Sequence, residues 1–274
     1  MTLSLRQATP AEGVQWLRDG FMLFTRRALP FTGMFVSFLM VALLATVVPV
    51  VGGVAMLMSL PLLTLGFMLG SRSARKNGVV HPGLFIEPLR AEQSRRKALL
   101  TLCAAYALAT VLIMNLSDWV DGGAFERLQR LLAAGEDGHA ELDALLGDPR
   151  LTWGLLTRFG LAALLSVPFW HAPALVYWQG QSTAQALFSS TLAVWRCRGA
   201  FFAYSLAWAA VIAFVGTLLG VLFALFGARQ LAGLVAMPAG LMFSTVFYVS
   251  LLFTYEGCFS DDTAPQPEAR LEAP

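Results

Sequence analysis

Residues 200–225 read AFFAYSLAWAAVIAFVGTLLGVLFAL, a run of apolar and small side chains that holds no charged residue. A helix needs about 20 mostly apolar residues to cross the hydrocarbon layer of a membrane, and this run exceeds that length. The whole chain has the same bias, because 57% of its 274 residues are hydrophobic and 13% are charged. Soluble domains have about 45–50% apolar and about 25% charged residues. The sequence therefore predicts a protein that folds in lipid.

Six such runs predict six membrane-spanning helices, at residues 28–48, 51–70, 98–116, 155–177, 200–225 and 231–255. A tight turn that begins at Pro49 joins the first two helices into a hairpin, and residues 227–230 join the last two. We expect an all-α integral membrane protein, a six-transmembrane-helix bundle with interfacial amphipathic helices. The predicted segments are a cytoplasmic interfacial helix (1–27), a first transmembrane hairpin (28–70), a basic cytoplasmic loop (71–97), the third spanning helix (98–117), an acidic periplasmic helical loop (118–154), the fourth spanning helix (155–177), a second cytoplasmic interfacial helix (178–199), a second hairpin (200–255) and a disordered cytoplasmic tail (256–274).

The basic residues are concentrated in alternate loops. Fourteen of the 19 Lys and Arg residues fall in the segments before the first span, between the second and third, between the fourth and fifth, and after the sixth. An excess of Lys and Arg marks the cytoplasmic side of a membrane protein. Segment 118–154 instead carries eight acidic residues against three arginines. We therefore expect both termini in the cytoplasm and segment 118–154 outside it.

Two segments outside the spans have the periodicity of amphipathic helices, which lie in the membrane plane. The apolar face of residues 12–25 is formed by Val14, Leu17, Phe21 and Phe24, and that of residues 183–196 by Leu187, Phe188, Leu192 and Trp195. Each is followed by basic residues and a hairpin, an order that predicts an internal parallel repeat. Segment 118–154 also shows helical spacing, interrupted at 135–138, and predicts two short surface helices.

The sequence SVPFWHAPALVYW at 166–178 is the strongest candidate for a polar site within a span. Pro168 and Pro173 each remove a backbone donor, and in lipid the freed carbonyl groups need partners inside the protein or in a hydrated cavity. His171 lies between them, and ionisable groups within spans are functional candidates. Trp170 and Asn115 complete the candidate site. Either the kinked helix lines a polar site where His171 binds a ligand or relays a proton, or His171 bonds to a neighbouring helix.

Motifs that carry catalysis or hold cofactors are missing from the sequence. It has no glycine-rich phosphate loop, no HExxH motif and no Cys/His set with metal-ligand spacing. Cys103, Cys197 and Cys258 form no CxxC pair and are expected to be reduced, small apolar fillers near the cytoplasmic face. The net charge of +2 gives no reason to expect a nucleic-acid partner. We expect no enzyme activity, no cofactor and no metal.

The loop at 71–97 is the most basic part of the chain and is suited to anionic lipid headgroups. The candidate headgroup contacts are Arg72, Arg75, Lys76, Arg95, Arg96 and Lys97. Two GxxxG patterns, at 66–70 and 216–220, allow helices to approach closely, either within the fold or in a dimer. The expected partners are the lipid bilayer, anionic lipids, and a membrane protein or a second copy of the chain.

The stretch FWHAPALVYW at 169–178, followed by ALFSS at 186–190 and by Trp195-Arg196, resembles a family of bacterial multi-pass membrane proteins of unknown function. The N-terminal WLRDGF at 16–21 agrees with that family, and the likeness covers about 10–257, least in segment 118–154. The resemblance implies an integral protein of the bacterial inner membrane and adds no catalytic residue. We expect a non-enzymatic accessory, assembly or envelope component. The alternative is a small-solute transporter or channel with a site near the Pro-broken fourth helix.

Overall fold

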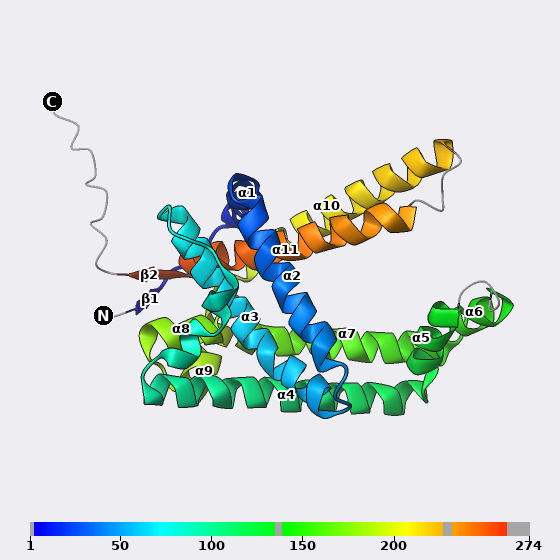
Figure 1. Ribbon diagram of the computed structural model, residues 1–274, viewed down its shortest axis with the longest axis horizontal. Coiled ribbons are helices and arrows are strands. Elements are labelled where there is room, and N and C mark those ends of the chain that lie inside the picture. Colours follow the sequence, from blue (N-terminus) through cyan, green and yellow to red (C-terminus); the bar gives the residue numbers. More distant parts are fainter. Residues whose placement is uncertain (1–2, 135–138, 227–231, 262–274) are drawn as a thin grey trace. The chain divides into compact units, whose positions relative to one another are not determined.

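The computed structural model describes residues 3–134, 139–226 and 232–261 (Figure 1). Almost all of this chain is helical. The elements are β1 (Leu3–Leu5), α1 (Pro10–Arg26), α2 (Ala28–Ala45), α3 (Val51–Arg75), η1 (Pro82–Phe85), η2 (Glu87–Arg90), α4 (Gln93–Asp121), α5 (Ala124–Ala134), α6 (His139–Leu146), α7 (Pro149–Phe169), α8 (Ala172–Gln179), α9 (Thr183–Arg196), α10 (Arg198–Leu225), α11 (Ala232–Cys258) and β2 (Phe259–Asp261).

Six helical segments are long and apolar enough to cross a membrane, which confirms the predicted fold class. They are Ala28–Ala45, Val51–Arg75, Gln93–Asp121, Pro149–Gln179, Arg198–Leu225 and Leu234–Cys258. The fourth begins earlier than the apolar run at 155, because Asp148 caps it by accepting a hydrogen bond from the Arg150 amide and Pro149 occupies the first turn. The predicted turn at 227–230 lies outside the described residues.

The chain divides into two compact units. The first contains Met1–Leu44, Leu62–Ala91 and Thr191–Pro274, and the second contains Ala45–Pro61 and Glu92–Ser190. In the first unit, α1 packs along both α10 and α11. Gly13 and Gly20 allow this close approach, because a Cβ atom at Gly13 would lie 2.0 Å from the Ala200 carbonyl oxygen and one at Gly20 would lie 2.6 Å from the Ser250 Cβ.

The packing of α1 differs from the predicted membrane-facing helix. Leu17 and Phe24, expected to contact lipid, are buried together with Trp16, whose ring meets the Phe201 ring edge-on at 5.5 Å. Val14, assigned to the same face, is 50% exposed. The amphipathic pattern identified a helix with one buried side, but the side is covered by protein, and the buried stripe is shifted to include the two glycines.

Helix α9 has the opposite arrangement. Phe188 and Trp195, on its predicted apolar face, are 69% and 67% exposed, whereas Ala186 and Ala193 are buried. Phe188 and Trp195 therefore present most of their surface to the surroundings and are available to lipid. The step from α9 to α10 through Cys197 matches the step from α1 to α2 through Arg27, since each places one residue between two helices. Beyond this local match, the internal repeat stays a prediction.

Stacked aromatic rings join α2, α3 and α11 in the first unit. The Phe67 ring lies 5.3 Å from the Tyr248 ring and 6.4 Å from the Phe31 ring, measured between centroids. Gly66 faces the Phe85 ring and Gly70 faces Met34 and Phe31, so the GxxxG pattern of α3 packs within the fold. Among the described residues, no atom lies within 4 Å of a Cβ built at Gly216 or Gly220 of α10.

A short strand pair, absent from the sequence prediction, ties the N-terminus to the end of α11. Strands β1 and β2 pair antiparallel, with Leu3 opposite Asp261 and Leu5 opposite Phe259. The pairing continues past the strand, because the Arg6 amide donates to the Cys258 carbonyl oxygen at 3.0 Å. We call residues 3–9 the N-terminal strap.

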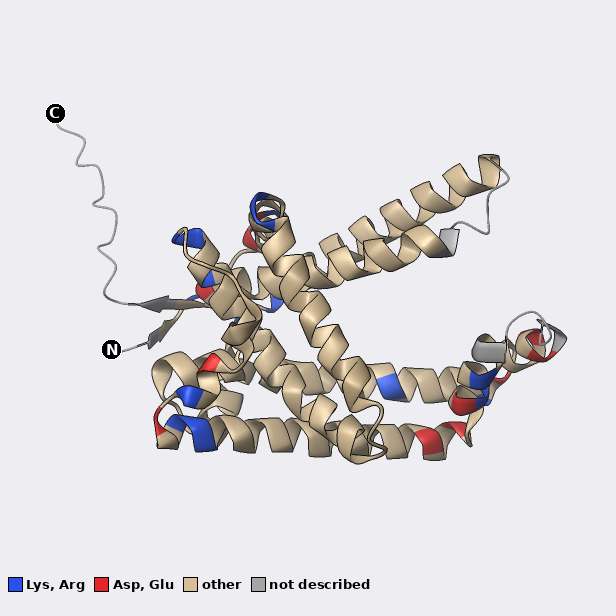
Figure 2. Cartoon of the chain, in the orientation of Figure 1, with Lys and Arg blue, Asp and Glu red and all other residues tan. Residues whose placement is uncertain are grey.

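In the second unit, α4 packs against α7 along their length. Helices α5 and α6 occupy the segment where two short helices were predicted, and the predicted break at 135–138 lies outside the described residues. A small apolar cluster of Ala124, Leu145 and Leu151 holds α5 and α6 on the start of α7. Figure 2 shows basic residues at the N-terminal end of α4, acidic residues at its C-terminal end, and a long uncharged stretch between them.

Candidate functional site

The predicted helix break exists in the second unit. Helix α7 ends at Phe169 and α8 begins at Ala172, so Trp170 and His171 connect them. Pro168 lies inside the last turn of α7 and Pro173 in the first turn of α8. The first N–H groups of a helix have no acceptor within the helix. Proline has no N–H group, so Pro173 leaves no donor unpaired and suits the start of a new helix. The two prolines therefore divide the fourth span into two helices.

Ser190 of α9 bonds to both sides of this break. Its Oγ donates to the Val167 carbonyl oxygen at 3.0 Å and accepts from the His171 amide at 3.0 Å. One hydroxyl thus satisfies an acceptor from α7 and the donor at the start of α8. In lipid such backbone groups need partners within the protein. Sequence reasoning missed Ser190, because serine on an amphipathic helix gave no signal of its target.

The surroundings of His171 are protein. Its side chain and residues 172–176 are buried, and Trp170 is half-buried. Asn115 is not part of this arrangement: it is exposed and its side-chain amide donates to the Val111 carbonyl oxygen of its own helix at 2.7 Å. The structure therefore brings together four of the five residues of the predicted polar site, and Asn115 is engaged elsewhere.

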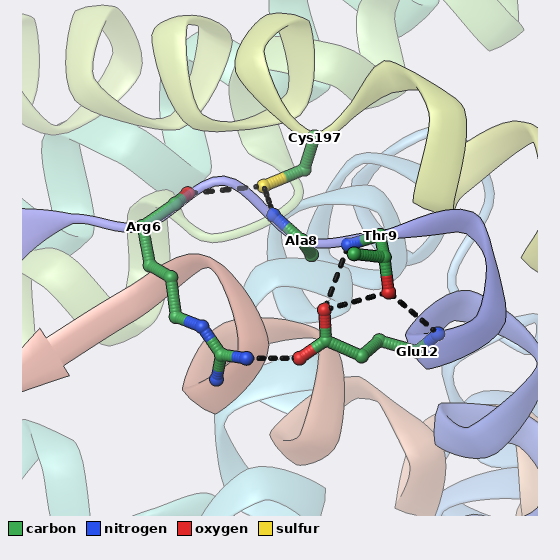
Figure 3. Close-up of polar contacts among 5 residues, drawn as sticks. All are labelled: Arg6, Ala8, Thr9, Glu12 and Cys197. Carbon is green, nitrogen blue, oxygen red and sulfur yellow. Dashed lines mark hydrogen bonds and ion pairs between the residues drawn. The ribbon is translucent and has the colours of Figure 1, made fainter. Parts of the chain in front are cut away.

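A second polar cluster lies where the N-terminal strap meets α1, in the first unit (Figure 3). Thr9 and Glu12 form a capping box: the Thr9 amide donates to Glu12 Oε2 at 2.7 Å, and Thr9 Oγ1 accepts from the Glu12 amide at 3.4 Å. Arg6 forms an ion pair with Glu12. The pKa of Glu12 is lowered, mainly by the hydrogen bond from the Thr9 amide. The positive charge of Arg6 lowers it further. The spacing of Thr9 and Glu12 is a signal that sequence reasoning overlooked.

Cys197 connects this cluster to the junction of α9 and α10. Its thiol donates to the Arg6 carbonyl oxygen at 3.3 Å, and the Ala8 amide donates to its sulfur at 3.5 Å (Figure 3). Cys258, at the end of α11, holds the Arg6 amide through its carbonyl oxygen. Both cysteine side chains are fully buried. Both were predicted to be small apolar fillers, but the Cys197 thiol also holds the strap through hydrogen bonds.

The chain resembles a known protein over nearly its whole length. A Burkholderia thailandensis protein, named a probable inner membrane protein, is 31% identical over 258 residues, which make up 94% of this chain and 94% of that protein. This chain belongs to the same inner-membrane protein family. No protein-family model and no solved structure matches it. Family membership agrees with the resemblance found in the sequence, whereas the motif at 169–178 stays a prediction.

The basic residues of this multi-pass membrane protein have two kinds of surroundings. Arg75 forms an ion pair with Glu256, and Arg95 donates to the Tyr177 carbonyl oxygen at 3.0 Å, near the C-terminal end of α8. Arg75 is exposed despite this ion pair, as are Arg72, Lys76, Arg96 and Lys97. Arg75 and Arg95 therefore have structural partners, whereas contact of the six residues with lipid headgroups stays a prediction.

Near the C-terminal end of α4, an ion pair and an aromatic ring hold α4 and α7 together. Arg158 of α7 bonds to Asp118 of α4 at 2.5 Å, and its guanidinium lies 4.0 Å from the centroid of the Phe125 ring. The arginine is 14% exposed, so it is held within the protein. Within the described ranges, no group of three or more His, Cys, Asp or Glu residues is arranged to hold a metal ion.

Proposed function

We propose that this chain is a non-enzymatic component of the bacterial inner membrane that acts through contacts of its helices with another membrane protein. The use of polar side chains in the spans and in the adjoining helix α9 supports this proposal. Ser190 bridges the α7–α8 break, Ser71 donates to the Val249 carbonyl oxygen at 3.2 Å, and the Tyr204 and Ser250 hydroxyls lie 2.6 Å apart. Catalysis needs polar groups that face a substrate, whereas these groups face the protein and join its helices.

The environment of His171 favours this proposal over a transporter or channel. Transport through the α7–α8 break requires a path by which water or solute reaches the break. His171 is 0% exposed, the next five residues are buried, and Ser190 bonds to backbone groups on both sides. A helix break whose backbone amide and carbonyl groups are bonded by Ser190 in this way is explained by packing.

We also propose that both termini face the cytoplasm and that Lys76, Arg96 and Lys97 contact anionic lipid headgroups. The distribution of basic residues supports the orientation. Arg96 lies in the first turn of α4, where the helix dipole disfavours a cation by about 0.3–1 kcal/mol, and Lys97 follows it directly. Anionic headgroups would compensate for this unfavourable placement.

Photo-crosslinking in native membranes tests the contact with a partner. A photoreactive amino acid replaces Leu218 of α10, which is 46% exposed, or Leu112 of α4, which is 61% exposed. The matched control replaces Leu252 of α11, which is 1% exposed. We expect a discrete protein adduct of constant mass from at least one of the exposed positions and none from Leu252.

The mass of the adduct distinguishes a second copy of the chain from a different protein, and peptide mass spectrometry identifies it. Lipid adducts alone at both exposed positions contradict the proposal. Turnover of a substrate by the purified chain, or solute flux in reconstituted vesicles that is lost on replacing His171, would also overturn it.

A further inference from the structure

Two cysteines from distant parts of the chain meet at the N-terminal strap. Cys197 is the single residue between α9 and α10, and Cys258 is the last residue of α11. The backbone of Arg6 lies between them, since its amide donates to the Cys258 carbonyl oxygen and its carbonyl oxygen accepts from the Cys197 thiol. Both side chains are 0% exposed, so protein encloses both sulfurs.

Both cysteines bond to the backbone of the same residue, Arg6, which places them side by side and close enough for their side chains to interact. The hydrogen bond from the Cys258 thiol is the largest influence on Cys197 and lowers the pKa of Cys197 to about 7. The Ala8 amide and the Arg6 charge also lower this pKa, whereas burial and the Glu12 charge raise it. A thiolate is the nucleophilic form of cysteine. The lowered pKa of Cys197 favours its thiolate at neutral pH more than in an ordinary cysteine, and the Cys258 thiol lies beside it.

We propose that Cys197 and Cys258 form a thiol-oxidation site, in which peroxide converts Cys197 to a sulfenic acid and Cys258 closes a disulfide with it. Sulfenic acids that lie next to a second thiol condense in this way. The Cys197 thiolate attacks one peroxide oxygen, the O–O bond breaks, and hydroxide leaves and becomes water with the thiol proton. Cys258 then attacks the sulfenic sulfur, the S–S bond forms, the S–O bond breaks, and a second water leaves. Two thiols are oxidised and one hydrogen peroxide is reduced to two waters.

The N-terminal strap controls access to the site and is altered by the reaction. The strap contacts the Cys197 sulfur, and its strand β1 has only three residues, so little backbone pairing has to open before the sulfur is reached. Because the disulfide has no S–H group, Cys197 no longer donates to the Arg6 carbonyl oxygen. Oxidation is therefore expected to loosen the strap while it links the start of α10 to the end of α11.

Thiol mapping of the full chain tests this assignment. The purified protein in detergent is treated with hydrogen peroxide, remaining thiols are blocked with N-ethylmaleimide, and peptides are analysed by mass spectrometry without reduction. We expect a Cys197–Cys258 disulfide, with Cys103 of α4 still alkylated. The Cys103→Ser variant should form the same disulfide. The Cys258→Ser variant should stop at the sulfenic acid of Cys197, which dimedone traps, and the Cys197→Ser variant should form neither product.

The pH dependence provides a second measurement. The alkylation rate of Cys197 in the Cys103→Ser variant should reach half its maximum near pH 7. Three results would overturn the assignment: both thiols surviving peroxide in the folded chain, Cys103 oxidising as fast as Cys197, or no dimedone adduct on Cys197 in Cys258→Ser. Each is read on folded protein, which gel filtration confirms before treatment.

Discussion

Substituting Gly13 by alanine should separate α1 from its partners more strongly than any change of polarity. A methyl group there would lie 2.0 Å from the carbonyl oxygen and 2.8 Å from the carbonyl carbon of Ala200. These are backbone atoms of α10, so no side-chain rotation relieves the overlap. Overpacking of this kind lowers the free energy of unfolding by about 1–3 kcal/mol. The better helix propensity of alanine offsets up to about 1 kcal/mol of this loss.

The overlap is severe, so we expect a net loss of about 2 kcal/mol in the free energy of unfolding, a change of roughly 30-fold in the equilibrium constant. Unfolding in mixed micelles titrated with dodecyl sulfate, followed by tryptophan fluorescence, measures this difference. Trp16 lies on α1 against Phe201 and contributes to the signal.

Gly33→Ala in α2 is the matched control for this experiment. Gly33 is exposed, and among the described residues no atom lies within 4 Å of a Cβ built there. The added methyl group should leave stability unchanged or raise it by up to about 1 kcal/mol. Equal stability of Gly13→Ala and Gly33→Ala would refute the close packing of α1 on α10.

Three further predictions follow from the remaining contacts. Ser190→Ala should lower the unfolding free energy by about 2 kcal/mol, since it leaves the buried His171 amide and the partly buried Val167 carbonyl without their partner. Ser166→Ala, whose hydroxyl bonds within its own helix, should change it by less than about 0.5 kcal/mol. Equal effects would refute the bridging role. The lowered pKa of Glu12 means that its ionised form stabilises the fold above its ordinary value of 4.5 and that this contribution disappears as pH falls through the lower folded value. Glu12→Gln should therefore be less stable than wild type at pH 7, by a margin that shrinks as pH is lowered below 4.5, and a constant difference would contradict this. In a chain without other cysteines, a membrane-impermeant maleimide applied to intact spheroplasts should label Leu146→Cys and not Ile86→Cys, and the reverse pattern would invert the proposed orientation.

The amphipathic segments mark the limit of prediction from periodicity. The apolar stripes of α1 and α9 look alike in the sequence, yet Leu17 and Phe24 are buried in protein, whereas Phe188 and Trp195 are exposed. Periodicity reports that one side of a helix avoids water. It does not distinguish lipid from another helix, because both are apolar.

In the candidate site, too, the sequence predicted one part and only the structure revealed the other. Pro168 and Pro173 predicted the break in the fourth span, since proline interrupts helical hydrogen bonds wherever it occurs. The partner at the break, Ser190, was not predictable, because the bond depends on where α9 lies against α7 and α8. The contact between Cys197 and Cys258 likewise joins two helix ends that no sequence spacing relates.

The six spans and the helical class were contained in the order of residues alone. In lipid every peptide group must bond within its own helix, so a long enough apolar run has one stable conformation. The docking of α1, the Ser190 bridge and the paired cysteines arose only when the helices packed. Apolar side chains are as stable against lipid as against another helix. Close packing and individual hydrogen bonds therefore decide which helices associate.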